Sequence, residues 1–284
     1  MDTREGAPDD AGERLVEEAR RLLTSAAARD LPVRVMGGIA VRLRCPGQAE
    51  VLRRFGRRYE DVDVVAYGKH AKPLRKTLSE LGYAADEEIF VNSGGSRMVV
   101  ALPAVKTHLD VFLDDLRFCH TIPMKGRLEL DEVTLPLADL LLQKLQIVRI
   151  NVKDIVDVIA LVLEHPLGKG DTDAIDADRI ATLTADDWGL WRTVTINLDR
   201  VREFCDEADQ LTAEERRRVA EQLDGLAVRI AAEPRGLRWN MRAKVGDRVK
   251  WYQDVEDLRE GEGVDPLAVE FHESAVGEAG HGPA

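Results

Sequence analysis

The sequence contains few cysteines, few aromatic residues and no long apolar run. Its 284 residues include only Cys45, Cys119 and Cys205, which are too few and too widely spaced for a disulfide framework or a CxxC metal knuckle. We therefore expect three buried free thiols. No apolar run approaches the length of about 20 residues that crosses a bilayer, so a membrane-spanning protein is not expected.

Basic residues are also in the minority. Lysine and arginine total 40 against 52 aspartate and glutamate residues, which gives a formal net charge of −12. This balance argues against a protein that coats nucleic acid with its whole surface, but it leaves room for a local basic patch. Residues 1–6 lack the basic start and apolar stretch of a secretory signal, so we expect a cytoplasmic protein without a membrane partner.

The hydrophobic pattern changes character near Pro136. Before it, short β-rich runs alternate with helical periodicity, and after it helices rich in leucine and isoleucine dominate. This order predicts an α+β fold, in which a small mixed or antiparallel sheet flanked by helices precedes a C-terminal α-helical domain. The expected divisions are a first domain at 13–135, a helical domain at 136–270, and disordered tails at 1–12 and 271–284.

The individual elements follow from periodicity and from turn residues. In the first half we expect helices at 13–30, 39–43 and 72–81, strands at 32–36, 61–67, 88–91, 97–102 and 107–113, and a hairpin turn at 92–95. In the second half we expect helices at 137–150, 152–163, 185–207, 212–233 and 235–257, with a loop at 169–180. The helix at 212–233 opens with a capping box, Thr212 to Glu215.

A double glycine, Gly37-Gly38, lies between the strand at 32–36 and the helix that follows. Glycine at this point lets the backbone approach phosphate oxygens closely, and the helix start offers free N–H groups to an anion. The alternative interpretation is a plain structural turn.

Three carboxylates fall on two predicted strands. Asp61 and Asp63 are two residues apart, so their side chains leave the same face of the strand and repel each other unless a cation lies between them. Asp110 lies among apolar residues of the strand at 107–113, where an unpaired charge is unfavourable. Oxygen ligands in this number suit Mg²⁺. The alternatives are a solvated strand face for the pair, and a salt bridge to an arginine for Asp110.

The order of these motifs resembles the nucleotidyltransferase superfamily typified by DNA polymerase beta. The matching features are a strand, Gly37-Gly38 with a short helix, Asp61-Val62-Asp63, and the later single Asp110. The stretches 134–145 (TLPLADLLLQKL) and 153–158 (KDIVDV) are similar to the branch that contains the AbiEii-type nucleotidyltransferase toxins of type IV toxin–antitoxin systems. The resemblance covers about residues 33–160.

The resemblance implies a nucleotidyltransferase-like sheet and a reaction that moves a nucleoside monophosphate from an NTP to an acceptor, releasing pyrophosphate. Asp61, Asp63 and Asp110 would be the catalytic and metal-binding carboxylates, with two Mg²⁺ ions, or Mn²⁺, as cofactors. The triphosphate, for example of ATP, would be bound by Gly37, Gly38 and Lys144, and Asp157 would orient Lys144 or the acceptor. Without the resemblance, Lys144 could instead extend its amine to solvent, and Asp157 could pair with Lys144, Lys153 or an arginine.

The acceptor is expected to be RNA, with tRNA favoured by the toxin-like motifs, and a cognate antitoxin is then an expected partner. Two basic segments, 42–58 and 235–250, are candidates for the RNA backbone. Trp239 within the second segment and Trp251 directly after it are candidates for base stacking. One alternative is a small-molecule, antibiotic-type nucleotidyltransferase. A second is a catalytically silent nucleotide-binding or partner-binding module, because Ile39 follows the glycines where many members carry serine or threonine.

Overall fold

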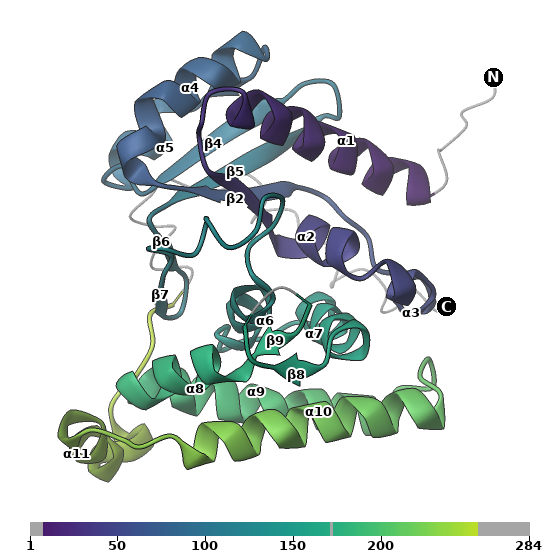
Figure 1. Cartoon of the computed structure of the whole chain (residues 1–284), viewed down its shortest axis with the longest axis vertical. Coiled ribbons are helices and arrows are strands. Elements are labelled where there is room, and N and C mark those ends of the chain that lie inside the picture. Colours follow the sequence, from purple (N-terminus) through teal and green to yellow (C-terminus); the bar gives the residue numbers. More distant parts are fainter. Residues whose placement is uncertain (1–7, 171–172, 255–284) are drawn as a thin grey trace, which may run out of the picture.

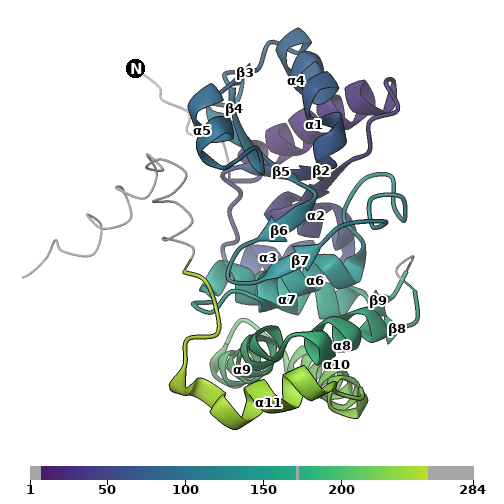
Figure 2. The ribbon, with the colours of Figure 1, turned by 90° about the vertical axis from the view of Figure 1, so that its left-hand side faces the viewer.

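The computed structural model describes residues 8–170 and 173–254, and within them the chain has the predicted α+β fold. A five-stranded sheet with α1, α4 and α5 forms the upper part of the molecule in Figure 1, and α8 to α11 form the lower part. Helices α6 and α7 lie between the two parts, as the second view also shows (Figure 2). No helix in the described ranges is both long enough and apolar enough to cross a membrane.

The elements have the following bounds. The strands are β1 (Val33–Met36), β2 (Val62–Ala66), β3 (Ala84–Ala85), β4 (Arg97–Leu102), β5 (Thr107–Leu113), β6 (Asp115–Arg117), β7 (Thr121–Pro123), β8 (Leu167–Gly168) and β9 (Ile175–Asp176). The α-helices are α1 (Pro8–Ala27), α2 (Gly37–Arg44), α3 (Ala49–Arg54), α4 (Ala71–Glu80), α5 (Glu87–Asn92), α6 (Leu137–Leu145), α7 (Val152–Glu164), α8 (Ala177–Asp186), α9 (Trp188–Glu207), α10 (Ala213–Ala232) and α11 (Leu237–Val245).

The main sheet is mixed, and its register brings the predicted carboxylates together. Its strand order is β1-β2-β5-β4-β3, with β2 and β5 parallel and the other neighbours antiparallel. Asp63 of β2 lies directly opposite Asp110 of β5. Residues that face each other across neighbouring strands project from the same side of the sheet, so these two side chains share one face.

Helix α2 connects the sheet to the helical half of the chain. It contacts β1 and β2 on one side and α6 and α7 on the other. Ile39, Ala40 and Val41 of α2 are buried, and so are all nine residues of α6. One continuous hydrophobic core runs from the sheet through α6 and α7 to α10. The division into domains at residues 135 and 136 stays a prediction, although the expected change to helix does occur at α6.

The prediction of a strand at 88–91 is wrong, because these residues belong to helix α5. The Asp86 side chain accepts a hydrogen bond from the backbone N–H of Ile89 at 3.1 Å, which is the contact of a helix N-cap. Gly94 and Gly95, both with positive φ, follow the end of the helix. The predicted hairpin turn at 92–95 is therefore the end of a helix, and the high β-propensity of Ile-Phe-Val was overridden by these caps.

Other boundaries also differ from the prediction. Helix α1 begins at Pro8, inside the tail expected at 1–12, while the tail expected at 271–284 lies outside the described residues. The loop expected at 169–180 already contains β9 and the start of α8, where the Asp176 side chain caps the helix. Helix α11 ends at Val245, because Gly246 takes a positive φ of 60°. The capping box of Thr212 and Glu215 is present as predicted.

All three cysteines are buried free thiols, as expected. Burial raises the pKa of each thiol, to about 12 for Cys205. A thiol with a raised pKa stays protonated at neutral pH, so these groups act as small apolar side chains of the core.

His120 is buried, and we expect it to make the stability of the fold decrease in acid. Its Nε2 lies 2.8 Å from Thr193 Oγ1, and burial lowers its pKa to about 4. The unfolded chain takes up this proton near pH 6.5, whereas the folded chain resists it down to about pH 4. We expect the free energy of unfolding to fall across this interval as the pH decreases, by on the order of 3 kcal/mol from this group.

The expected decrease in the free energy of unfolding can be measured by urea denaturation of the wild type and of His120→Gln between pH 7 and pH 4. The variant should lose less stability over the interval, because its side chain does not titrate. Equal slopes for the two proteins would contradict the assignment to His120.

Candidate functional site

The three predicted carboxylates gather where the start of β2 lies beside the middle of β5. Asp61 immediately precedes β2, Asp63 is its second residue, and Asp110 lies beside Asp63. Burial raises the pKa of Asp63 well above its ordinary value, and the charges of Asp61 and Asp110 raise it further. Burial also raises the pKa of Asp61. The site therefore concentrates negative charge where water solvates it poorly, which favours a bound cation.

Asp110 is held by two basic side chains. The Arg97 guanidinium donates to it from Nε at 3.1 Å and from Nη2 at 3.0 Å to each oxygen, and His108 Nε2 lies 3.5 Å from Oδ2. Burial alone would raise the pKa of Asp110, but the hydrogen bond from His108 and the charge of Arg97 outweigh it and lower the pKa. The predicted alternative, an arginine salt bridge, is thus present at Asp110.

Gly37 begins α2 directly against the carboxylate of Asp63. Its φ is +67°, and a Cβ atom placed on it would lie 2.1 Å from Asp63 Oδ2. Met36, the residue before it, pairs with Asp63 across β1 and β2. Both the backbone conformation and the close approach require glycine here, so the double glycine does more than make a turn: it makes room for a carboxylate at a helix start.

We expect Gly37→Ala to lower the free energy of unfolding by about 2 kcal/mol or more, from the positive φ and the contact with Asp63 together. Gly56→Ala is a matched control, because Gly56 has a φ of +64° but no heavy atom within 4 Å of the added Cβ. The control should show the backbone strain alone, on the order of 1 kcal/mol. Thermal or urea denaturation of both variants measures the difference, and equal losses would contradict the tight contact with Asp63.

Gly38 packs against Arg57, which belongs to the basic segment 42–58. A Cβ atom on Gly38 would lie 2.3 Å from Arg57 Nη2. The same guanidinium makes a two-pronged ion pair with Asp157 of α7, with Nε to Oδ1 at 2.8 Å and Nη2 to Oδ2 at 2.9 Å. It also stacks on the ring of Tyr59, 4.8 Å from the ring centroid. The absence of a side chain at Gly38 therefore leaves space for the Arg57 guanidinium, as it does at Gly37 for the Asp63 carboxylate.

Lys144 completes a buried network of charges around Asp157. Its Nζ lies 2.8 Å from Asp154 Oδ1 and 3.0 Å from Asp157 Oδ2, and Asp157 is fully buried. Burial would lower the pKa of Lys144, but the two carboxylates outweigh it and raise the pKa. Burial would likewise raise the pKa of Asp157, but Lys144 and Arg57 outweigh it and lower the pKa. Lys144 and Asp157 are thus both charged at neutral pH.

The ion pair proposed as the alternative role of Asp157 is therefore present, with two partners, Lys144 and Arg57. Lys144 does not extend to solvent, because its side chain is only 11% exposed. Its role as a ligand of a triphosphate stays a prediction. The network fixes helices α6 and α7 next to the start of α2.

Gln143 is a residue of the site that sequence reasoning missed. Its Oε1 accepts a hydrogen bond from the backbone N–H of Gly37 at 3.4 Å, and its buried Nε2 has no hydrogen-bond partner among the described residues. The only signal in the sequence was a polar residue beside Lys144 on an otherwise apolar helix. Gln143 thus ties the start of α2 to α6 and leaves an amide donor at the site.

The donor chemistry of the site fits a hard divalent cation, because Asp61, Asp63 and Asp110 offer oxygen atoms and no sulfur. In their present positions, however, no three acidic, histidine or cysteine side chains within the described ranges form a group that could hold a metal ion. The carboxylate of Asp110 is engaged by Arg97. Asp63 and Asp110 are neighbours because of the β2–β5 register. Asp61 lies near them because it is only two residues before Asp63 in the chain.

The first basic segment, 42–58, is largely neutralised by ion pairs. The pairs other than that of Arg57 are Arg42 with Glu13, Arg44 with Asp131, Arg53 with Glu50, and Arg54 with Glu215. Arg58 is exposed. Most of these arginines therefore hold elements together, which reduces the basic surface that the sequence suggested.

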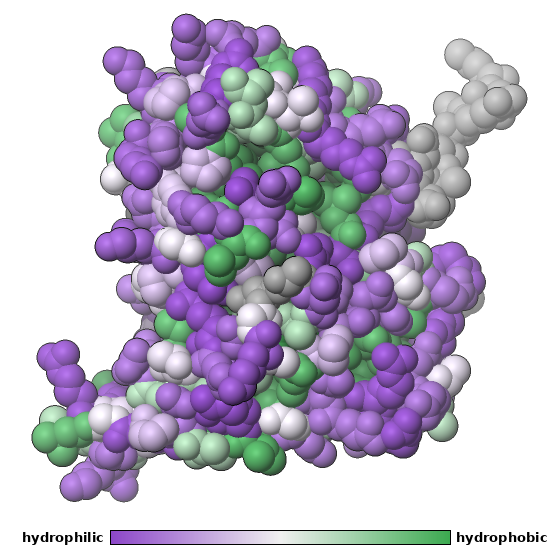
Figure 3. All heavy atoms as spheres, viewed as in Figure 1, coloured by the Kyte–Doolittle hydropathy of each residue, from purple (hydrophilic) through white to green (hydrophobic). Residues whose placement is uncertain are grey.

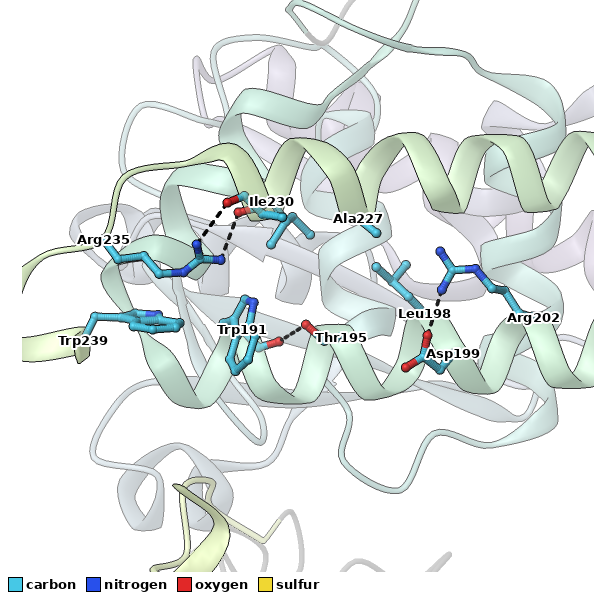
Figure 4. A pocket seen from close by; sticks show the side chains of 10 residues that line it. Trp191, Thr195, Leu198, Asp199, Arg202, Ala227, Ile230, Arg235 and Trp239 are labelled. Carbon is cyan, nitrogen blue, oxygen red and sulfur yellow. Dashed lines mark hydrogen bonds and ion pairs between the residues drawn. The ribbon is translucent and has the colours of Figure 1, made fainter. Parts of the chain in front are cut away.

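The second basic segment, 235–250, lies on and around α11, and its tryptophans pack into the protein. The Trp191 and Trp239 rings are 5.1 Å apart, and Arg235 stacks on Trp239 at 4.6 Å while donating to the end of α10. These residues line one end of a pocket of about 430 Å³ between α9, α10 and α11 (Figure 4). Trp251 packs on Trp188. The tryptophans thus attach α11 to α9.

The outer side of α11 is exposed and partly apolar. Leu237 and Met241 are 76% and 52% exposed. In Figure 3 most of the visible face is hydrophilic, and apolar atoms reach the surface at the lower left, where α11 lies in Figure 1. Three exposed cations lie beside them, at Arg238, Lys244 and Arg248.

A scan of protein-family models and a search of curated proteins find no match to this chain. The functional interpretation therefore depends on the geometry of the site.

Proposed function

We propose that the protein is a metal-dependent nucleotidyltransferase that transfers a nucleoside monophosphate from an NTP to an acceptor. The observation that supports this best is the register of Asp63 beside Asp110, with the carboxylate of Asp63 packed on Gly37 at the start of α2. This arrangement puts carboxylate oxygens for a cation next to backbone N–H groups for a phosphate. An NTP bound with Mg²⁺ needs both.

In this proposal Asp61, Asp63 and Asp110 would hold two Mg²⁺ ions, or two Mn²⁺ ions instead. Bound Mg²⁺ would supply charge stabilisation for the entering and departing oxygens. The acceptor oxygen forms a bond to the α-phosphorus, the bond from this phosphorus to the bridging oxygen breaks, and pyrophosphate leaves. The proton of the acceptor hydroxyl passes to a carboxylate of this set.

Gly37 and Gly38 would let the triphosphate approach the start of α2, and the free amide of Gln143 adds a donor there. Lys144 would attract the triphosphate by its positive charge while it stays paired with Asp157, which orients it. In this proposal the triphosphate lies where α2 meets α6 and α7.

RNA is the acceptor we propose, most specifically tRNA, in a cytoplasmic toxin with a cognate antitoxin as partner. The exposed cations Arg58, Arg238, Lys244 and Arg248 support an anionic acceptor. A small hydroxyl compound is the second candidate. It is favoured by the ion pairs that neutralise most of the segment 42–58 and by the net charge of −12.

The test incubates the protein with Mg²⁺, each of the four labelled NTPs in turn, and total RNA or a metabolite extract. We expect label in tRNA-sized RNA. Label in a low-mass product would move the proposal to the small-molecule acceptor. If no label is transferred and calorimetry detects no Mg²⁺-dependent NTP binding, the proposed activity is wrong, and the silent-module alternative takes its place.

A further inference from the structure

Arg97 is the basic residue most directly engaged with the predicted metal ligands. It lies at the start of β4, diagonally across from Asp110, and its guanidinium contacts both oxygens of that carboxylate at 3.0 to 3.1 Å. The Arg97 side chain is 20% exposed, against 7% for Asp110. It also lies over the ring of Phe112, 5.5 Å from the centroid. The guanidinium thus lies between the carboxylate and solvent.

The other two cations of the site are held differently. Lys144 and Arg57 pair with Asp154 and Asp157 of α7, neither of which is a predicted metal ligand. Binding of a metal ion to the strand carboxylates would leave those pairs intact. Arg97, by contrast, pairs with Asp110, which is one of the three carboxylates that the cation would use.

A divalent cation and the Arg97 guanidinium compete for the same two oxygens of Asp110. Both are positive, so a cation at these oxygens repels a guanidinium that stays about 3 Å away. Once displaced, a partly exposed guanidinium gains most from an anion nearby, and its planar set of donors matches phosphate oxygens as well as it matches a carboxylate.

We propose that Arg97 is a phosphate-binding residue that exchanges its Asp110 partner for the triphosphate of the NTP when a divalent cation binds. The cation then favours NTP binding by releasing Arg97, and the NTP favours cation binding by holding Arg97 away from Asp110. This inference rests on the proposed function. It adds a mechanism by which Arg97 neutralises Asp110 until a cation binds, so that the site accepts cation and nucleotide together.

The test measures binding, without turnover. Free Mn²⁺ is followed by electron paramagnetic resonance, with and without an NTP analogue whose α,β-bridge is a methylene group and cannot be cleaved. We expect Arg97→Gln to bind Mn²⁺ alone about tenfold more tightly than the wild type and to bind the analogue with Mn²⁺ about tenfold more weakly. The mutual enhancement between Mn²⁺ and the analogue should disappear.

Arg97→Lys keeps the charge but loses the two-pronged contact, so its affinities should change in the same directions by a smaller factor. It also serves as the test variant if Arg97→Gln does not fold. Arg117→Gln is the matched control, because Arg117 is exposed and pairs with Asp115, which is not one of the predicted metal ligands. Its affinities should equal those of the wild type.

The outcomes separate this inference from the proposed function. If the wild type binds Mn²⁺ and the analogue cooperatively but the Arg97 variants behave like it, Arg97 is only a structural partner of Asp110 and this inference is overturned. Weaker Mn²⁺ binding in Arg97→Gln would overturn it as well. If the wild type binds neither Mn²⁺ nor the analogue, the proposed function itself fails.

Discussion

Asp63→Asn is expected to abolish nucleotide transfer, with a loss of about 10³-fold or more, and to leave the protein folded. Asp63 is the carboxylate that touches Gly37, lies beside Asp110 and is two residues from Asp61 in the chain. Asparagine has the same shape, so it still fits against Gly37, but it removes a negative charge from the cation site. Transfer of labelled NTP to RNA measures the effect.

The stability of this variant provides a second readout. Because burial and the neighbouring carboxylates raise the pKa of Asp63, its ionised form destabilises the fold at neutral pH. The free energy of unfolding of Asp63→Asn should therefore equal or exceed that of the wild type. Asp30→Asn is a control, since Asp30 is exposed and has a φ of 53° that asparagine tolerates. Wild-type turnover in Asp63→Asn would remove the mechanism, and a large loss of stability would show that Asp63 is needed for folding.

Asp157→Ala should lower the free energy of unfolding by about 3 to 5 kcal/mol, the usual effect of removing one partner from a buried ion pair. Asp157 is fully buried and neutralises both Arg57 and Lys144. Without it, two cations share the remaining carboxylate of Asp154, and Arg57 loses a two-pronged contact. Urea denaturation with tryptophan fluorescence measures the change.

Asp154→Ala is the matched control for this experiment. It removes a contact of similar length to Lys144, but the Asp154 side chain is 17% exposed and Lys144 keeps Asp157. Its loss should be smaller, about 1 to 2 kcal/mol. Equal losses for the two variants, or a loss below 1 kcal/mol for Asp157→Ala, would show that the network around Lys144 does not hold α7 against α2.

Much of the fold could be predicted where local and tertiary preferences agree. The runs around Val33 and Val62 are short and rich in valine, and the run around Val111 is mostly apolar; they occur in the structure as β1, β2 and β5. Prediction failed at Ile89-Phe90-Val91, where side-chain preference indicates a strand but the caps on either side form a helix. Caps act on backbone hydrogen bonds, and a search for alternating apolar residues does not register them.

For the candidate site, the alternation of residues within each strand placed Asp63 and Asp110 on the buried strands. Their direct opposition depends on the β2–β5 register, which is set by packing between segments 47 residues apart in sequence. Arg97 could not be chosen as the partner of Asp110 without the β4–β5 register, nor Arg57 as the partner of Asp157 without the position of α7. Gln143 was not distinguished, since its role arises from a contact with Gly37 across helices.

The sequence by itself determined which residue types are available: few thiols, no membrane-spanning run, a glycine pair after a strand and three aspartates in β-rich segments. Those properties follow from composition and from neighbours along the chain, where periodicity and turn chemistry act. Only the tertiary structure decided which charges meet. Ion pairs form between groups a few ångströms apart whatever their distance in sequence. The packing of α6 and α7 with α2 therefore decided which cations are held by α7, and the pairing of β4 with β5 decided which arginine engages Asp110.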